Sequence, residues 1–307
     1  MLSDTEWFST QGGRGCANVA PFMLHDADRG EWADALERGR IVFFARCPVP
    51  LPAGEDQDFL RHGLDPWLRR KNVSWYPEAD KLSGLRAPAF LLERARRILR
   101  EHAFRVREFL EREMPGFSTS WTQGTSSFRP LEEKGRALSP HASNELIHID
   151  AGVYGATHGD RILRFFVNLN PARERVWISK GTFEEVFRLH GEEAGVRPGR
   201  LAPRAPERAF QRMVRLTSRA LPMARVIDTS PYDRRMRRLH NWMKDAASFQ
   251  QPPYQRLSFP SGSAWMALTD GLSHACVSGQ HALVDTFLVP LRNCKRPAPW
   301  HLLAGEA

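Results

Sequence analysis

Two neighbouring segments in the middle of the chain constrain its fold more than any other part of the sequence. Within 161–170, apolar and polar side chains alternate, which is the pattern of a β-strand with two different faces. One face is apolar from Leu163 onward: Leu163, Phe165, Val167 and Leu169. The other face carries an arginine, a phenylalanine and two asparagines: Arg164, Phe166, Asn168 and Asn170. Because such polar groups are unusual on a core strand, we expect this face to line a polar cavity.

The preceding segment, 144–150, contains His148 and Asp150. On a strand, residues two positions apart share a face, so these two side chains are expected to converge. An imidazole and a carboxylate can hold two adjacent positions of a metal ion, and a second histidine can complete the facial triad that suits non-heme Fe(II). The tripeptide alone is weak evidence, since chance predicts roughly 0.5 of them in a chain of this composition.

His274 is the predicted third metal ligand. It lies among short C-terminal strand patterns at 255–259, 263–268, 272–280 and 282–289. In a double-sheet jelly roll an early strand pair and a late strand lie side by side at the mouth, so the three residues can meet there. His281 is the competing histidine, but it follows Gly279 at a predicted turn. A core histidine bonded to a carbonyl is the alternative interpretation of His274.

The order of the predicted elements favours an α+β fold in a single domain, residues 1–307. Helical patterns at 31–38 and 88–114 dominate a mostly helical N-terminal part, 1–116, whereas short strand patterns fill 117–187 and 255–290. A polar loop at 131–141 resembles loops that cover active sites. We therefore expect a double-stranded β-helix (jelly-roll) core with flanking helices and a basic helical insertion at 188–250.

The chain is basic, with 44 Lys and Arg against 35 Asp and Glu and a net charge of +9. This balance predicts an acidic partner: nucleic acid, an anionic membrane surface, or a phosphorylated or carboxylated substrate. Within the insertion, 207–220 is expected to form a basic amphipathic helix. A second helix is expected after a Ser230-x-x-Asp233 capping pattern, and its cations are Arg234, Arg235, Arg237, Arg238, His240 and Lys244. Anion binding and simple solvation explain these cations equally well.

Other sequence features concern the compartment. The four cysteines show no CxxC pair, which fits a reducing environment better than a disulfide framework. The start of the sequence has no basic and apolar regions of a signal peptide, and no stretch approaches the roughly 18 apolar residues of a spanning helix. We therefore expect a cytoplasmic protein.

The spacing of His148, Asp150 and His274 resembles that of the Fe(II)/α-ketoglutarate-dependent dioxygenase superfamily. The resemblance implies Fe(II) and α-ketoglutarate (2-oxoglutarate) as cofactors and O2 as co-substrate. Many members supply the cation for the far carboxylate of α-ketoglutarate about ten residues after the distal histidine, but 275–290 contains no Arg or Lys here. Other members place it on the strand after His-x-Asp, and Arg164 fits that variant because a guanidinium binds a carboxylate bidentately. Asn168 is expected to assist, and Arg292 is the fallback.

A narrower resemblance, to the bacterial Kdo 3-hydroxylases, covers 144–150, 161–171, 231–249 and 272–287. It implies hydroxylation of the 3-position of the octulosonic acid sugar Kdo on Kdo-lipid A, giving Ko, during lipopolysaccharide modification. It also implies peripheral contact with the anionic inner face of the inner membrane. By position, Arg129 is a candidate for substrate anions or for α-ketoglutarate. The candidates in the basic helix are Arg234, Arg238, His240 and Lys244.

Three alternatives remain open from the sequence. The same oxygenase chemistry could act on another anionic substrate, nucleic acid or protein. Nucleic acid is not expected, because Trp242 and Phe249 are the only aromatic residues from Arg234 to Phe249 and each suits a core. A non-catalytic cupin-like metal-binding protein is the second alternative. A zinc hydrolase is the third, and it is disfavoured because no catalytic Glu accompanies the histidines.

Overall fold

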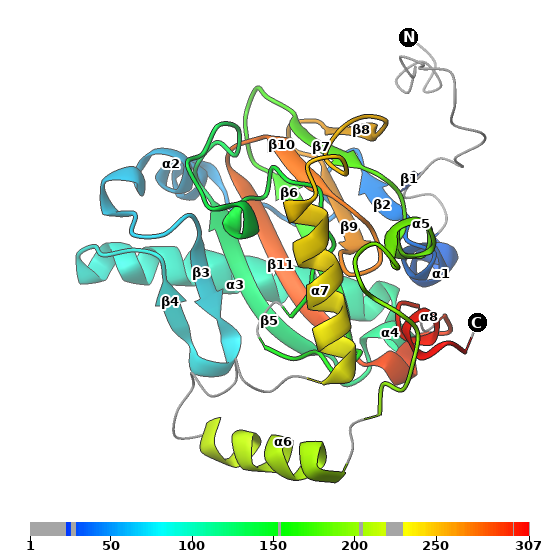
Figure 1. Ribbon diagram of the computed structural model, residues 1–307. Helices are drawn as coiled ribbons and strands as arrows, with labels where there is room; N and C mark the ends of the chain where they lie inside the picture. Colours follow the sequence, from blue (N-terminus) through cyan, green and yellow to red (C-terminus); the bar gives the residue numbers. More distant parts are fainter. Residues whose placement is uncertain are drawn as a thin grey trace.

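Two β-sheets face each other, and helices cover both outer sides (Figure 1). The computed structural model describes residues 23–25, 29–152, 155–202, 205–218, 230–296 and 298–306. The mixed helix-and-sheet architecture expected from the sequence is confirmed, with a large, mainly antiparallel sheet at its centre.

The large sheet has eight strands in the order β1-β2-β9-β6-β11-β5-β3-β4. The β1–β2 pair is parallel and the other pairs are antiparallel. Its strands, in sheet order, are β1 (Met23–His25), β2 (Ile41–Phe44), β9 (Ala264–Leu268), β6 (Arg161–Asn168), β11 (Ala282–Val289), β5 (Thr122–Arg129), β3 (Val73–Tyr76) and β4 (Lys81–Ser83). The small antiparallel sheet consists of β10 (Ala275–Ser278), β7 (Arg175–Ser179) and β8 (Gln255–Phe259).

The described α-helices are α1 (Trp32–Glu37), α2 (Gly54–His62), α3 (Ala89–Glu113), α4 (Pro115–Ser118), α5 (Phe183–His190), α6 (Ala205–Ser218), α7 (Pro231–Asp245) and α8 (Trp300–Ala304). Short 3-10 turns are η2 (Arg29–Glu31), η3 (Asp65–Trp67), η4 (Pro77–Ala79), η5 (Pro140–Ala142) and η7 (Leu291–Asn293). The N-terminal part, 1–116, contains α1, α2 and α3, and it also contributes β2, β3 and β4 to the large sheet. β2 pairs with β9, and β3 pairs with β5, so strands from later in the chain hold these early strands in the large sheet.

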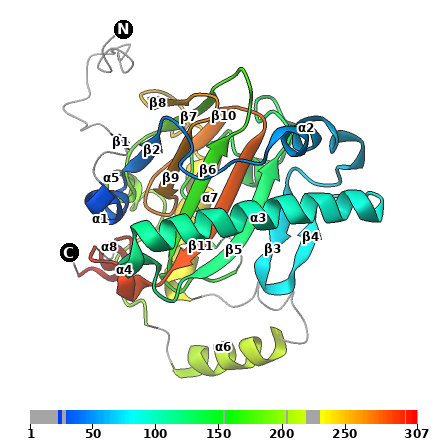
Figure 2. The same cartoon turned by 180° about the vertical axis from the view of Figure 1, so that it is seen from behind.

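Helix α3 crosses the outer face of the large sheet (Figure 2). Apolar residues recur along it at helical spacing, and one stripe of them, including Ile98, Leu99 and Val106, is buried. This stripe belongs to the same core as Leu163, Phe165 and Val167 on β6. The apolar face predicted for β6 therefore packs under helices, which turns Arg164 and Phe166 towards the space between the sheets.

Aromatic side chains fill much of the space between the two sheets. The Trp265 ring on β9 stacks on Phe166 and Phe259, with ring centroids 5.1 and 3.8 Å apart. Trp177 on β7 meets Trp265 edge-on at 5.6 Å. Such pairs add to the free energy gained by burying their large apolar areas. This layer fixes β7 against β6 and so sets the depth of the cavity described below.

Helix α7 lies across the opposite side of the molecule from α3 (Figure 1). The predicted capping pattern is confirmed: the Ser230 hydroxyl accepts from Asp233 N–H, and the Asp233 carboxylate accepts from Ser230 N–H. Ile147 and Ile149 are buried in the same core as apolar α7 residues such as Leu239. This packing holds the segment with His148 and Asp150 beneath α7.

Replacing Trp265 with alanine should cost about 3–5 kcal/mol of unfolding free energy, because its stacking partners cannot collapse into the space left. Urea unfolding followed by far-ultraviolet circular dichroism measures this. Phe90→Ala is the control, since Phe90 is 70% exposed on α3 and its loss should cost less than about 1 kcal/mol. Similar losses in both variants would contradict the stabilising role of the layer between the sheets.

Candidate metal centre and active site

His148, Asp150 and His274 come together as the sequence predicts, with one ligand atom from each lying within 4.8 Å of the others. The segment around His148 is extended but is not the regular strand expected. It forms a single antiparallel bridge to His274. His148 N–H donates to the His274 carbonyl (3.0 Å), and His274 N–H donates to the His148 carbonyl (2.8 Å). Asp150 N–H donates to Thr269 O (2.8 Å). These backbone bonds bring the two imidazoles side by side.

Both histidines are arranged to present Nε2. The Nδ1 atom of His148 lies 2.7 Å from Leu146 O, and that of His274 lies 3.1 Å from Leu272 O. Because a carbonyl only accepts, each Nδ1 carries the hydrogen and each Nε2 keeps its lone pair. Burial lowers the pKa of both imidazoles, and the neighbouring His274 lowers that of His148 further. Both are therefore neutral at pH 7, as metal ligands must be.

The carboxylate of Asp150 completes the donor set. Burial raises the pKa of Asp150, but the charge of Arg164 is the largest of the influences that hold that pKa well below its usual range. Arg164 Nη2 lies 2.9 Å from Asp150 Oδ2. Two neutral imidazole nitrogens and one ionised carboxylate on one side of a cavity match the donors of a non-heme Fe(II) site that leaves positions open.

A small cavity of about 50 Å³ lies at this group of residues. The residues that line it are Arg129, Asn144, His148, Asp150, Arg164, Phe166, Trp177, His274 and Cys276. The Nε atoms of Arg129 and Arg164 are buried and have no hydrogen-bond partner among the described residues. Buried donors without partners are rare in folded proteins, so their presence beside a cavity indicates an anionic ligand.

Of the three residues predicted to bind α-ketoglutarate, two lie at the cavity and one does not. Arg129 and Arg164 line the cavity, but Asn168 does not. Its amide nitrogen donates to Arg173 O and Phe259 O, at 2.9 and 3.0 Å. The prediction that Asn168 assists α-ketoglutarate is therefore corrected: its amide group is used in the turn after β6. His281 lies outside the metal-ligand group.

His240 and Lys244, which the sequence offers as candidates for substrate anions, lie on the inner side of α7 and bind backbone carbonyl groups there. His240 Nδ1 lies 2.5 Å from Ile149 O, and its ring meets the His148 ring edge-on at 5.2 Å. Lys244 is buried, and its ammonium donates to His141 O and Ser143 O at 3.1 and 2.8 Å. Both residues tie α7 to the two segments that flank the cavity.

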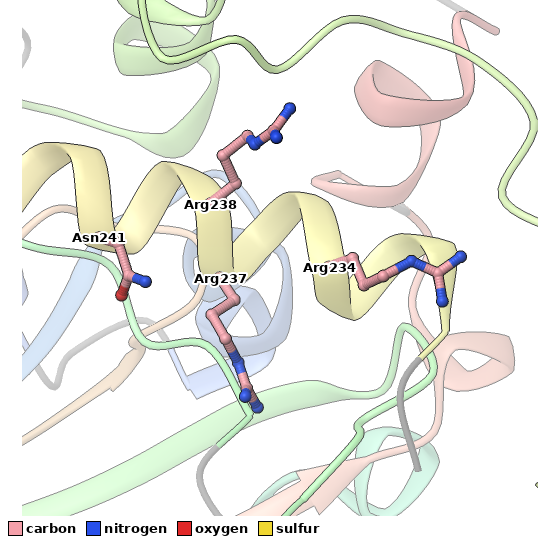
Figure 3. Close-up of a pocket in the computed structure, with 4 residues that line it drawn as sticks. All are labelled: Arg234, Arg237, Arg238 and Asn241. Carbon is pink, nitrogen blue, oxygen red and sulfur yellow. The ribbon is translucent and has the colours of Figure 1, made fainter. Parts of the chain in front are cut away.

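Arg234 and Arg238 instead lie on the outer face of α7, where Arg237 and Asn241 join them around a shallow hollow of about 350 Å³ (Figure 3). Arg234 pairs with Glu207 of α6 at 2.8 Å, and Arg238 Nη1 donates to Gly195 O at 3.0 Å. The three guanidinium groups point away from one another. This face is therefore a broad cationic surface and not a clamp for one anion.

The sequence did not single out several residues at the cavity. Trp177 stacks on the His274 ring at 5.1 Å, and Asn144 and Cys276 form other parts of the wall. Trp177 shares a face of β7 with Arg175, two positions earlier, and this alternation is visible in the sequence. The sequence does not show that this side of β7 contacts the histidines, because that contact depends on how the two sheets pack against each other.

Comparisons with known proteins agree with this geometry. The structure of the Kdo hydroxylase KdoO, a non-heme Fe(II) α-ketoglutarate-dependent dioxygenase in complex with α-ketoglutarate and Fe(III), superposes with a TM-score of 0.76. It is 28% identical over 92% of this chain and 95% of that chain. The structure of KdoO in complex with cobalt(II) superposes with a TM-score of 0.77, and it is 29% identical over 94% of this chain and 96% of that chain. The apo structure of KdoO superposes with a TM-score of 0.76, and it is 27% identical over 92% of this chain and 95% of that chain.

Comparison with curated protein sequences gave no match. The sequence model of the 3-deoxy-D-manno-oct-2-ulosonic acid (Kdo) hydroxylases matches residues 23–304. Since that match covers nearly the whole chain and the folds superpose over most of their length, this chain belongs to the Kdo hydroxylase family.

Proposed function

We propose that this protein is an Fe(II)/α-ketoglutarate-dependent dioxygenase that hydroxylates the 3-position of Kdo on Kdo-lipid A, giving Ko in lipopolysaccharide modification. The observation that carries the proposal is the grouping of His148, Asp150 and His274 beside a cavity lined by arginines. Membership of the Kdo hydroxylase family supplies the sugar and the reaction type. The lipid A part of the substrate rests on the proposal alone.

We assign the two facing sheets to a double-stranded β-helix within one dioxygenase domain, residues 1–307. Two observations support this assignment. Strands from both ends of the described chain, β2 and β11, belong to the same sheet. The predicted metal ligands come from an extended segment at 144–150 and from His274, the residue before β10, and the two meet at a single bridge.

In this assignment His148 Nε2, His274 Nε2 and the Asp150 carboxylate hold Fe(II). Fe(II) and α-ketoglutarate held there would supply the activation of O2, by which one oxygen atom would enter a substrate C–H bond and the other would end in the succinate formed from α-ketoglutarate with loss of CO2. The protein keeps both imidazoles neutral by burial, and Arg164 keeps Asp150 ionised. Phe166 and Trp177 form apolar walls that restrict water at the site.

Arg129 and Arg164 are the proposed partners of α-ketoglutarate. Arg164 already pairs with Asp150, but its buried Nε–H is unused. Arg129 also has an unused Nε–H, and burial lowers the pKa of its guanidinium to about 10, which leaves it a cation at pH 7. A dicarboxylate that chelates the metal at one end requires such a cation at the other end.

The metal assignment predicts the result of an anaerobic titration with Fe(II) and α-ketoglutarate. Wild-type protein should develop the weak visible charge-transfer band of the chelate, and His148→Ala should not, because removing one ligand weakens metal binding by about 100-fold or more. His281→Ala is the matched control and should retain the band. A band of normal intensity in folded His148→Ala would rule out the assignment.

The substrate assignment predicts that Kdo-lipid A gains one oxygen atom, seen by mass spectrometry, when Fe(II), α-ketoglutarate and O2 are supplied. Arg129→Ala should raise the KM for α-ketoglutarate by about 10-fold or more, since a buried charge-assisted pair is lost. A chelate band without this product would favour another anionic substrate, nucleic acid or protein. No band in folded protein would favour the cupin-like metal-binding alternative.

We also propose peripheral contact with the anionic inner face of the inner membrane, through α6. This helix stands apart from the body of the molecule in both views (Figures 1 and 2). Phe210 and Met213 on it are 46% and 54% exposed, and Arg208 and Arg212 are also exposed. An apolar side next to cations is typical of helices that lie in a membrane surface. No helix among the described residues is long and apolar enough to cross a membrane.

Vesicle sedimentation tests this contact. Wild-type protein should bind vesicles that contain phosphatidylglycerol better than vesicles of phosphatidylcholine, and added salt should weaken the binding because it screens exposed charges. Phe210→Ser should reduce binding by about 5-fold, because the variant lacks the aromatic ring that the membrane surface would bury. Phe90→Ser, at an exposed position on α3, is the control. Equal reduction by both substitutions would contradict a specific role of α6.

A further inference from the structure

We propose that Glu133 is the internal counter-ion of Arg129, one of the two proposed co-substrate arginines, and of its neighbour Arg175: it holds both guanidinium groups in position and cancels one of their charges before α-ketoglutarate binds. Glu133 lies between β5 and η5, within the polar loop that the sequence predicts to cover the site. This inference rests on the proposed function, because it concerns the same cavity.

The Glu133 side chain is 1% exposed and faces several cations. Its Oε1 lies 3.2 Å from Arg175 Nη2 and 3.6 Å from Arg129 Nη1. Its Oε2 lies 3.5 Å from Arg136 Nη1 and accepts from the Asn144 amide at 3.1 Å. A single buried carboxylate thus joins arginines from β5 and β7 and a residue of the cavity wall.

The charge state of Glu133 follows from these neighbours. Burial raises the pKa of Glu133, but Arg129 and Arg175 outweigh burial and lower it below the ordinary value. Glu133 is therefore an anion at pH 7. Asp150, the other buried anion here, pairs with Arg164. Arg129, Arg136, Arg164 and Arg175 together carry four positive charges, and the two carboxylates cancel two of them. The small excess suits one dianion that also binds a divalent metal.

The backbone around Glu133 restricts Arg175 from the other side. Glu133 N–H and Arg175 Nη1 both donate to Gly279 O, each at 3.2 Å. Gly279 has a φ of 139°, and a Cβ on it would lie 2.6 Å from Arg175 Cγ. Only glycine fits there, so the loop, the turn after β10 and Arg175 meet at one point. Glu133 is thus a positioning residue whose own carboxylate does not line the cavity.

Without Glu133, the buried guanidinium groups would repel one another, and any small dianion would relieve the repulsion. Metal-free Glu133→Gln at low ionic strength should therefore melt about 5 °C or more below wild type. About 5 mM sulfate should restore most of this loss, whereas wild type should shift by less than about 1 °C at a concentration too low for general salt effects. Differential scanning fluorimetry measures both values.

Glu145→Gln is the matched control. Glu145 belongs to the same part of the chain and accepts from Gly135 N–H at 3.0 Å, but the structure gives it no arginine partner among the described residues. Adding about 5 mM sulfate should not raise the melting temperature of Glu145→Gln. If sulfate did not restore the melting temperature lost in Glu133→Gln, Glu133 would only anchor the loop and the proposal would be overturned. An unchanged melting temperature in Glu133→Gln would overturn it as well.

Binding of α-ketoglutarate to the cobalt(II)-loaded protein, measured by calorimetry, separates this inference from the proposed function. In Glu133→Gln, about 50 mM sulfate should raise the Kd by about 10-fold, because the sulfate occupies the uncompensated arginines, whereas wild type should change by less than about 2-fold. Equal sensitivity in both proteins would overturn the proposal. If wild type failed to bind α-ketoglutarate, the proposed function would fail. The effect of sulfate on the melting temperature of metal-free protein would still test the counter-ion role of Glu133.

Discussion

The two backbone hydrogen bonds between His148 and His274 are the constraint on which the site depends. They join an extended segment in the middle of the chain to a residue well over a hundred positions later. Because they leave each Nδ1 bonded to a local carbonyl, they also fix which nitrogen faces the cavity. The aromatic layer between the sheets supports the bridge from below, where Trp177 stacks on the His274 ring. The histidine pair is thus positioned by the backbone and by stacking before any metal binds.

The second organising feature is a group of buried charges that compensate one another. Arg164 pairs with Asp150, and Glu133 faces Arg129 and Arg175. An isolated buried charge is costly, so each of these groups is stable there only with its partner or with a ligand. Among the buried polar atoms without partners in the described residues, the Nε–H groups of Arg129 and Arg164 belong to side chains that line the cavity. A dicarboxylate would satisfy them, which links the electrostatics of the cavity to the co-substrate.

Helix α7 connects the site to the outer surface. Its inner side holds the flanks of the cavity through His240 and Lys244, and its outer side presents Arg234, Arg237 and Arg238. Asp233 at its start accepts from Thr157 N–H at 2.7 Å, which ties the helix to the loop that follows Asp150. An anionic substrate or surface on the outer side would therefore contact an element that also braces the metal ligands.

The sequence by itself determined the features that depend on local spacing: the two-faced strand at 161–168, the His-x-Asp pair, the capping pattern before α7 and the excess of cations. His274 could be predicted because a jelly roll brings an early strand pair and a late strand together, and Arg164 because a family pattern places a cation on the strand after His-x-Asp. Only the tertiary structure decided that Asn168 serves a turn, that His240 and Lys244 face inward, that Trp177 lines the cavity and that Glu133 faces Arg129 and Arg175. Periodicity tells which side chains share a face, but it cannot tell what packs against that face, since that contact is made by residues distant in the chain.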